Sequence, residues 1–292
     1  MVENRLLLYF VTAARCMNIT RAARDLHVAQ PALTRGIRHL EAEMGVQLFR
    51  REKNRISLTE AGGAFLVEAE ATLRQLESSV VTAQRAARGE IGRIEIAFIS
   101  TAGLAVIPGL VQRFRRQYPG PMIILHELRA AEIEDGLRNG SLDVGVSYGP
   151  MREREFLVRT LHADRLVVAL PETHRLARAR SIDLSALRDE VFILPNYETA
   201  GTLVNEILAE CHRAGFQPRI GHSIATTTVM TTLGLIASGV GVTVTTENVR
   251  PFAPRQVVFR PIRGSTITLG LSIMCRLQDH SPVVQNFLSL AT

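Results

Sequence analysis

The chain has 292 residues, of which 34 are basic and 28 are acidic, so its net charge is +6 at pH 7. This length is enough for two or three domains with substantial cores. No run of about 18 apolar residues is present, and charged residues begin at position 3, which argues against a membrane span and a secretory signal. We therefore expect a cytoplasmic protein without a membrane partner.

The three cysteines, Cys16, Cys211 and Cys275, are widely spaced. Such spacing suggests neither a disulfide framework nor a metal site. We expect each thiol to fill a small apolar space in a reducing compartment. The sequence therefore predicts no metal ion and no cofactor.

The excess positive charge is concentrated at the N-terminal end. Residues 1–58 contain ten Lys and Arg residues against five Asp and Glu residues, and the rest of the chain is close to neutral. A concentration of this kind indicates a polyanionic partner.

This basic region predicts three helices. Residues 4–16 form one amphipathic stretch, and a second helix follows in "RAARDL", where Thr20 is placed to cap it. After the turn "HVA" a third helix begins near Gln30, with one apolar stripe made of Leu33, Ile37, Leu40 and Met44. Its opposite face carries Pro31, Thr34, Arg35 and Arg38, with Gln30 at the tip. Two helices joined by a tight turn, the second polar on its outer face, are typical of a helix-turn-helix.

A basic segment from Arg50 to Arg55 follows, between the strand-like runs "VQLF" and "RISL". Considered alone, this segment reads as a solvated surface loop. Directly after a helix-turn-helix, a charged hairpin is better interpreted as a wing.

A long helix is expected from Thr59 to about Arg88. Its apolar residues have heptad character and are Phe65, Ala69, Leu73, Leu76, Val80, Ala83 and Ala87. The helix could pack internally, but it is too long for the small domain before it. Since Gly89 and Gly92 end it and a different pattern follows, we favour a dimerisation helix.

Beyond residue 92, strands and helices alternate. Repeated units of this kind predict a mostly parallel sheet that is covered by helices on both faces. In such sheets ligands lie at the carboxyl ends of strands, near helix N-termini. Three segments occupy that position: Ser100-Thr101, Asn196 to Thr199, and Thr226 to Thr228.

The chain resembles the LysR-type transcriptional regulators. The resemblance is densest in "ITRAARDLHVAQPALTRGIRHLEAEMGVQLFRR" and "ISLTEAG", and continues more sparsely through "SLDVGV", "LPETHRLA" and "ASGVGVTV". It covers nearly all of the chain. Two positions depart from the family pattern: Gly36 replaces a larger polar residue, and Thr246 stands where proline is usual. Gly36 is expected to remove a possible contact and to weaken its helix by roughly 1 kcal/mol relative to alanine.

The resemblance implies an α+α/β fold. It comprises a winged helix-turn-helix (1–58), a linker and dimerisation helix (59–89) and a periplasmic-binding-protein-like effector domain (90–292). The effector domain would have subdomain I at about 93–162 and 267–292, and subdomain II at about 163–266. Double-stranded DNA, a small-molecule effector in the interdomain cleft, further copies of the chain in a dimer of dimers, and RNA polymerase are the partners implied.

The candidate DNA contacts follow from this architecture. Arg35 has the geometry to bind guanine in the major groove, while wing residues contribute affinity through the DNA backbone. Thr20, near a helix N-terminus, is expected to bind a phosphate. The full expected set is Thr20, Gln30, Pro31, Thr34, Arg35, Arg38, Arg51, Lys53 and Arg55.

The candidate effector site is rich in hydroxyl groups. Its expected residues are Ser100, Thr101, Arg129, Tyr148, Asn196, Tyr197, Thr226 and Thr246. Hydroxyls and backbone N–H groups at helix N-termini suit an oxyanion, and we expect a small carboxylated metabolite.

Two other classes of protein are compatible with parts of the sequence. Residues 145–149, "GVSYG", match the nucleophile motif of serine hydrolases, with Ser147 as nucleophile and His162 or His174 available as a base. That motif requires a helix directly after the serine, whereas Pro150 follows here. A solute-binding protein would account for the second domain and would leave residues 1–90 unexplained.

Overall fold

The computed structural model describes residues 2–52, 55–149, 155–194, 201–221, 226 and 228–291. The chain divides into two compact units, Met1–Arg85 and Ala86–Thr292. None of the helices described in these ranges is long and apolar enough to cross a membrane.

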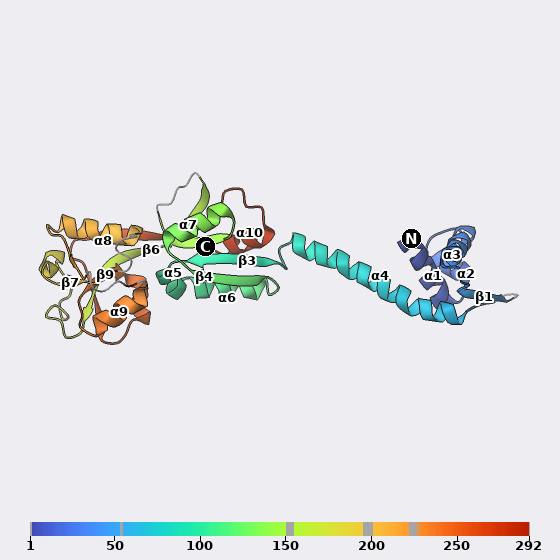
Figure 1. The fold of residues 1–292 in the computed structure, drawn as a ribbon, viewed down its shortest axis with the longest axis horizontal. Coiled ribbons are helices and arrows are strands. Elements are labelled where there is room, and N and C mark those ends of the chain that lie inside the picture. The colour runs from blue at the N-terminus through green and yellow to red at the C-terminus, as the bar shows by residue number, and fades with distance from the viewer. Residues whose placement is uncertain are drawn as a thin grey trace. The chain divides into compact units, whose positions relative to one another are not determined.

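The first unit contains the expected helices and hairpin (Figure 1). Its elements are α1 (Asn4–Cys16), α2 (Ile19–Asp25), α3 (Gln30–Met44), β1 (Phe49–Glu52), β2 (Arg55–Leu58) and α4 (Glu60–Ala87). Two details differ from the expectation. Asn18, and not Thr20, caps α2, because its side chain accepts a hydrogen bond of 3.0 Å from Arg21 N. The strand expected at "VQLF" begins instead at Phe49, so β1 extends into the basic segment.

The apolar stripe of α3 is buried as predicted. Leu33, Ile37 and Leu40 are fully buried against residues of α1, β1 and α4. Phe10 of α1 lies at the centre of this core, with ring centroids 5.4 Å from Phe49 and 5.1 Å from Phe65. Burial of these side chains fixes the face that α3 presents to solvent.

The apolar seam expected along α4 is divided between two environments. Ala69 is buried in the core of the first unit, and Phe65 and Leu73 pack against it. Further along, Leu76 is 44% exposed and Val80 is 51% exposed. The first half of the seam therefore serves internal packing, and only the second half is open within the described chain.

The second unit has a mixed α/β architecture (Figure 1). Its helices are α5 (Ser100–Ala105), α6 (Ile107–Gln117), α7 (Ala130–Asn139), α8 (Thr202–Arg213), α9 (Val229–Ala237) and α10 (Pro282–Ser289), with short 3-10 helices η1 (Leu184–Leu187) and η3 (Glu247–Phe252). Its strands are β3 (Arg93–Phe98), β4 (Met122–Glu127), β5 (Val144–Tyr148), β6 (Phe156–Pro171), β7 (Val191–Phe192), β8 (Arg219–Ile220), β9 (Thr243–Thr246), β10 (Val257–Pro261) and β11 (Thr268–Arg276).

The expectation of a mostly parallel sheet was wrong. The main sheet has the order β10-β6-β11-β5-β3-β4, with β9 also paired to β6. β3 is parallel to β4 and β5, but β11 is antiparallel to both β5 and β6, and β9 and β10 are antiparallel to β6. Strands β10 and β11 and the first half of β6 were not anticipated, because helix–strand alternation alone does not reveal strands that return antiparallel.

Strand β6 connects the two halves of the second unit. Phe156–Arg165 pairs with β11 beside β5 and β3, and Leu166–Pro171 pairs with β9 and β10. Figure 1 shows β6 running between the half that contains β3 to β5 and the half that contains β9, α8 and α9. This crossing brings residues from both halves to one pocket.

Candidate nucleic-acid interface and ligand pocket

The solvent face of α3 is polar and cationic. Gln30, Pro31, Arg35 and Arg38 are exposed, and Thr34 is half-buried beside them. Positions 31, 34, 35 and 38 fall on one side of the helix because they are separated by three, one and three residues. No ion pair of Arg35 or Arg38 is found in the described part of the chain. Both guanidinium groups thus face solvent, and no acid among the described residues neutralises them.

The position of α3 is fixed at its C-terminal end. Glu41 Oε1 accepts hydrogen bonds from Leu48 N (2.9 Å) and Phe49 N (3.1 Å). These charge-assisted bonds tie the helix to the start of β1. The side chains of Arg51 and Arg55, and the whole of Lys53, lie outside the described residues, and Thr20 is exposed in the first turn of α2.

Gly36 has a packing role that the sequence did not reveal. A β-carbon at this position would lie 2.7 Å from Cδ2 of Tyr9 and 3.3 Å from Cδ2 of Leu6. The glycine thus lets α1 and α3 approach closely. The close packing of α1 against α3 offsets the low helix propensity of glycine. This contact could not be detected from the residues on the surface of α3 alone.

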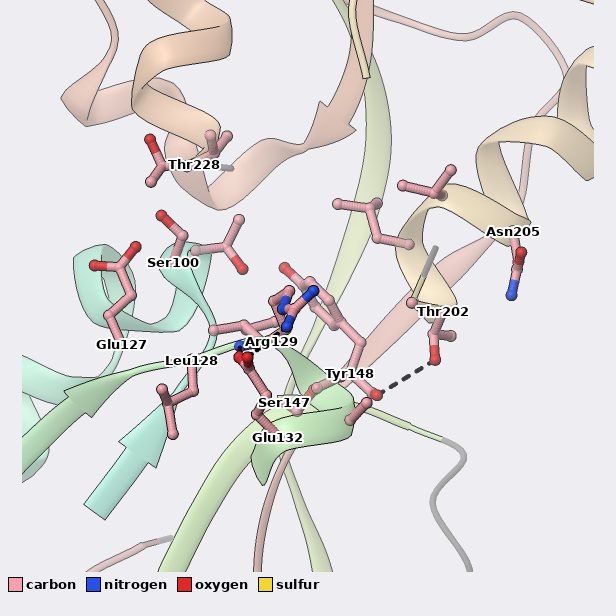
Figure 2. A pocket seen from close by; sticks show the side chains of 18 of the residues that line it. Ser100, Glu127, Leu128, Arg129, Glu132, Ser147, Tyr148, Thr202, Asn205 and Thr228 are labelled. Carbon is pink, nitrogen blue, oxygen red and sulfur yellow. Dashed lines mark hydrogen bonds and ion pairs between the residues drawn. The ribbon is translucent and has the colours of Figure 1, made fainter. Parts of the chain in front are cut away.

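A pocket of about 750 Å³ lies in the second unit (Figure 2). It is bordered by residues after β3 and β4, by the end of β5, by β9, and by the starts of α8 and α9. This location agrees with the expectation that ligands meet strand ends and helix N-termini. Its volume is in the range of small-molecule sites, roughly 300–1,000 Å³.

The pocket brings together four of the residues expected to bind an effector. Ser100, Thr101, Arg129 and Tyr148 line it. Thr226 and Thr246 are buried but are not among the lining residues. Asn196 and Tyr197 lie outside the described residues.

Tyr148 and Thr246 form a buried hydrogen-bonded chain. Tyr148 Oη donates to Thr246 Oγ1 (3.0 Å), which donates to Asn248 Oδ1 (2.8 Å). Burial raises the pKa of Tyr148, which keeps the phenol protonated and able to donate. Thr246 therefore positions a lining residue, and this chain joins β5 to the end of β9.

Thr226 also acts from behind the pocket wall. Thr232 Oγ1 donates to Thr228 O (3.1 Å), so the hydrogen bond of 2.8 Å between Thr226 and Thr232 uses the Thr226 hydroxyl as donor. The pair holds the first turn of α9, where Thr228 and Thr232 line the pocket.

Several lining residues were missed by sequence reasoning. They include Glu127, Glu132, Ser147, Thr202, Asn205 and Thr228, of which Ser147 was considered only as a nucleophile and Thr228 only as part of a segment. Thr202 opens α8 after Gly201, so its pattern of a small residue and a threonine before an amphipathic run could have identified it.

Donors to an anion are available at two places on the pocket wall. No described side chain caps the N-terminus of α8, whereas Thr228 caps α9 by accepting from Thr231 N (3.2 Å). Thr101 is 4% exposed, and its hydroxyl makes no hydrogen bond of regular geometry among the described residues, although it lies close enough to the Tyr148 phenol to lower the pKa of that group. An uncapped helix start and a buried, unsatisfied hydroxyl both favour a hydrogen-bonding ligand.

Arg129 is already engaged by Glu132. The two Glu132 carboxylate oxygens accept hydrogen bonds from Arg129 Nη2 (2.5 Å) and from Arg129 N (2.9 Å). The Arg129 guanidinium and backbone lower the pKa of Glu132 to about 2. The carboxylate thus stays ionised and cancels the positive charge of Arg129.

The serine-hydrolase alternative is contradicted by the geometry of Ser147. This residue is buried within β5 and lies opposite Ser272 of β11, in regular strand pairing. A nucleophile elbow requires a sharp turn from strand to helix at the serine. Ser147 therefore lacks the backbone conformation of an activated nucleophile.

Comparison with known proteins accounts for both units. Residues 4–63 match the family model "Bacterial regulatory helix-turn-helix protein, lysR family", and residues 87–292 match "LysR substrate binding domain". The chain is 31% identical over 290 residues to the HTH-type transcriptional regulator AlsR of Bacillus subtilis (strain 168), covering 99% of this chain and 95% of that protein. It is 33% identical over 289 residues to the Hca operon transcriptional activator HcaR of Escherichia coli (strain K12), covering 99% of this chain and 97% of that protein.

Solved structures show the same architecture over the full length. The crystal structure of CbnR, a LysR family transcriptional regulator, has a TM-score of 0.85 and 27% identity, and covers 99% of this chain and 100% of that chain. Full-length CbnR complexed with its target DNA has a TM-score of 0.84 and 27% identity, and covers 99% of this chain and 98% of that chain. The chain therefore belongs to the LysR family of DNA-binding transcriptional regulators, which are not enzymes, and it combines the family's helix-turn-helix with an effector-binding domain.

Proposed function

We propose that this regulator responds to a small carboxylated metabolite held in the pocket of its second unit. The observation that carries the proposal is the buried hydroxyl of Thr101, which makes no regular hydrogen bond among the described residues and shares the pocket with the start of α8, which no described side chain caps. A carboxylate oxygen is an acceptor that satisfies both kinds of donor, and the helix dipole at α8 favours its negative charge. Ser100 adds a further hydroxyl to the pocket lining, and Thr202 adds one from α8 that donates to Tyr148 O (3.4 Å).

The two halves of the second unit are the elements that the effector would move relative to each other. We assign residues 93–162 and 267–292 to one subdomain and residues 163–266 to the other. Pocket residues come from both, since Ser100 and Arg129 belong to the first and Thr202 and Thr228 to the second. An effector that binds one arrangement more tightly than the other shifts the population by no more than that difference in affinity.

In the first unit, we assign DNA readout to the exposed face of α3. Arg35 is unpaired among the described residues and has the donor fork that recognises guanine, while Gln30 and Thr34 have the chemistry for base or phosphate contacts. Wing residues Arg51, Lys53 and Arg55 would add affinity along the backbone, and Thr20, Pro31 and Arg38 would complete the interface.

The proposal is tested with Ser100→Ala and Thr101→Val together. A thermal-shift screen of carboxylated metabolites on the full chain first identifies a ligand. A ligand at 100 times its Kd stabilises the folded state by about 2.7 kcal/mol, which raises the unfolding temperature. The double variant should bind operator DNA normally without ligand and lose about 10- to 150-fold in ligand affinity, since two hydrogen-bond donors are removed. A variant that folds and keeps full ligand affinity would show that these hydroxyls do not hold the effector.

A further inference from the structure

We infer, building on the function proposed above, that the effector carries one carboxylate on an otherwise uncharged body and that the pocket rejects dicarboxylates. The charges on the pocket wall carry this inference. Among the described lining residues, those with charged side chains are Glu127, Arg129, Glu132, Glu134 and Asp135. Acids outnumber the single base.

Arg129, the one cation among the described lining residues, is not available to a ligand carboxylate without competition. Arg129 forms an ion pair with Glu132, which also accepts from the Arg129 backbone N–H. Figure 2 shows this pair at the centre of the pocket, with the Glu132 carboxylate against the Arg129 side chain. A ligand carboxylate that sought Arg129 would have to displace an acid that is held at both oxygens.

The remaining acids differ in how they are compensated. Asp135 lies 2.8 Å from Arg138, and Glu134 lies 4.0 Å from it. The side chain of Glu127 has no ion pair or hydrogen bond within the described parts of the chain, and it is exposed at the end of β4. In Figure 2 its side chain extends into the pocket beside Ser100. The uncompensated charge on the described wall is therefore negative.

Neutral donors are sufficient for one carboxylate but not for two. The Thr101 hydroxyl and the uncapped N-terminus of α8 supply hydrogen bonds and a partial positive charge. A second carboxylate in the same pocket would find no free cation among the described residues and would face Glu127. Because like charges repel, the dianion is penalised.

The rest of the wall suits an apolar body. Val204, Val229 and Val244 of the lining are already buried, whereas the aliphatic side chains of Leu128 and Leu203 are partly exposed. Their burial by a ligand is favourable in proportion to the apolar area removed from water. The wall thus combines neutral carboxylate donors, aliphatic surface and an acidic edge.

The test compares matched pairs of acids that share a skeleton. Benzoate is paired with terephthalate and hexanoate with adipate, and each is titrated into the full-length protein at pH 7.5 by calorimetry and ligand-observed NMR up to millimolar concentration. We expect at least one monocarboxylate to bind, and to bind about tenfold or more tightly than its dicarboxylate partner. Glu127→Gln should reduce the ratio of monocarboxylate to dicarboxylate affinity by about tenfold. The substitution removes the repulsion between Glu127 and the second carboxylate and keeps the shape of the side chain.

Glu172→Gln is the matched control, since Glu172 is an exposed acid outside the pocket lining and its loss changes the net charge equally. It should leave the ratio unchanged. Tighter binding of dicarboxylates would overturn the inference and leave the proposed function standing. Failure of every acid to bind would contradict the proposed function itself. An unchanged ratio in Glu127→Gln would refute the assignment of the discrimination to Glu127.

Discussion

The backbone of Gly62 in the first turn of α4 packs directly against the carbonyl oxygen of Leu48. A β-carbon at position 62 would overlap that carbonyl, whereas a β-carbon on the neighbouring Gly63 would meet no atom within 4 Å. Thr59 reinforces the junction, because its hydroxyl donates to Gln47 O (2.7 Å) and accepts from Gly62 N (2.9 Å). The absence of a side chain at position 62 therefore lets the long helix start against the loop that precedes β1.

Gly62→Ala and Gly63→Ala are expected to have opposite effects on stability. Gly62→Ala should destabilise the first unit by about 1–3 kcal/mol, as overpacking against rigid backbone does. Gly63→Ala should stabilise it by up to about 1 kcal/mol, since alanine has the higher helix propensity. Hydrogen exchange of the α3 and α4 amides in the full chain reports both changes. Equal effects of the two substitutions would contradict the close contact at Gly62.

Arg35→Ala should reduce sequence discrimination on DNA. Loss of a bidentate base contact is expected to cost about 1–3 kcal/mol on the specific site and much less on random DNA. Arg74→Ala is the control, since this arginine lies on α4, outside the exposed face of α3, with 65% of its side chain exposed. Fluorescence anisotropy at fixed salt measures both. Equal losses on specific and random DNA would assign Arg35 to phosphate binding instead.

The open half of the α4 seam predicts an interface with a second copy of the chain. Leu76 and Val80 are one helical turn apart and exposed, so Leu76→Glu with Val80→Glu should place charges in a coiled-coil core and halve the number of chains per assembly. Val67→Glu is the matched control, because Val67 is 63% exposed on the opposite side of the same helix. Sedimentation velocity distinguishes the species. An unchanged assembly in the double variant would remove this seam from the interface.

Asp164→Asn should stabilise the second unit near neutral pH. Asp164 is 3% exposed, one of its carboxylate oxygens has no hydrogen-bond partner among the described residues, and burial raises its pKa from 3.8. His162, 3.3 Å away, opposes this shift without cancelling it. Because the folded state holds the proton more tightly than the unfolded state, ionisation costs stability as pH rises through 3.8 and beyond. We expect a gain of about 1 kcal/mol at pH 7, as for relief of a buried unpaired acceptor.

That gain should disappear as pH falls below 3.8, where Asp164 is protonated in both states. Asp183→Asn is a control of opposite sign, because hydrogen bonds from Ser185 lower the pKa of Asp183. Its carboxylate stabilises the fold above pH 3.8 and loses that contribution as pH falls through the lowered value. Thermal unfolding of the full chain from pH 3 to pH 7 compares the two variants. Destabilisation by Asp164→Asn at neutral pH would show that the charge has a compensating partner.

Much of this protein could be predicted from local pattern. The stripe of Leu33, Ile37 and Leu40 specified which face of α3 is buried, because a helix repeats every 3.6 residues whatever its surroundings. The long helix expected from Thr59 to about Arg88 is α4, since its apolar repeat and the glycine that follows are local signs. Ser100 and Thr101 directly follow a predicted strand, and ligands lie at the carboxyl ends of strands, so their place in the pocket could also be predicted from local sequence.

Other properties depended on which segments meet in space. The antiparallel partners of β6 come from far along the chain, so the sheet is mixed although its local alternation suggested parallel strands. Gly36 and Gly62 matter through Tyr9 and Leu48, which local helix propensity does not register. Arg129 was expected in the effector site, and the fold adds that its charge is cancelled by Glu132. The chemistry of the pocket depends on groups that come from both halves of the second unit. Only the tertiary structure determines which of their charges are neutralised by a neighbour and which are not.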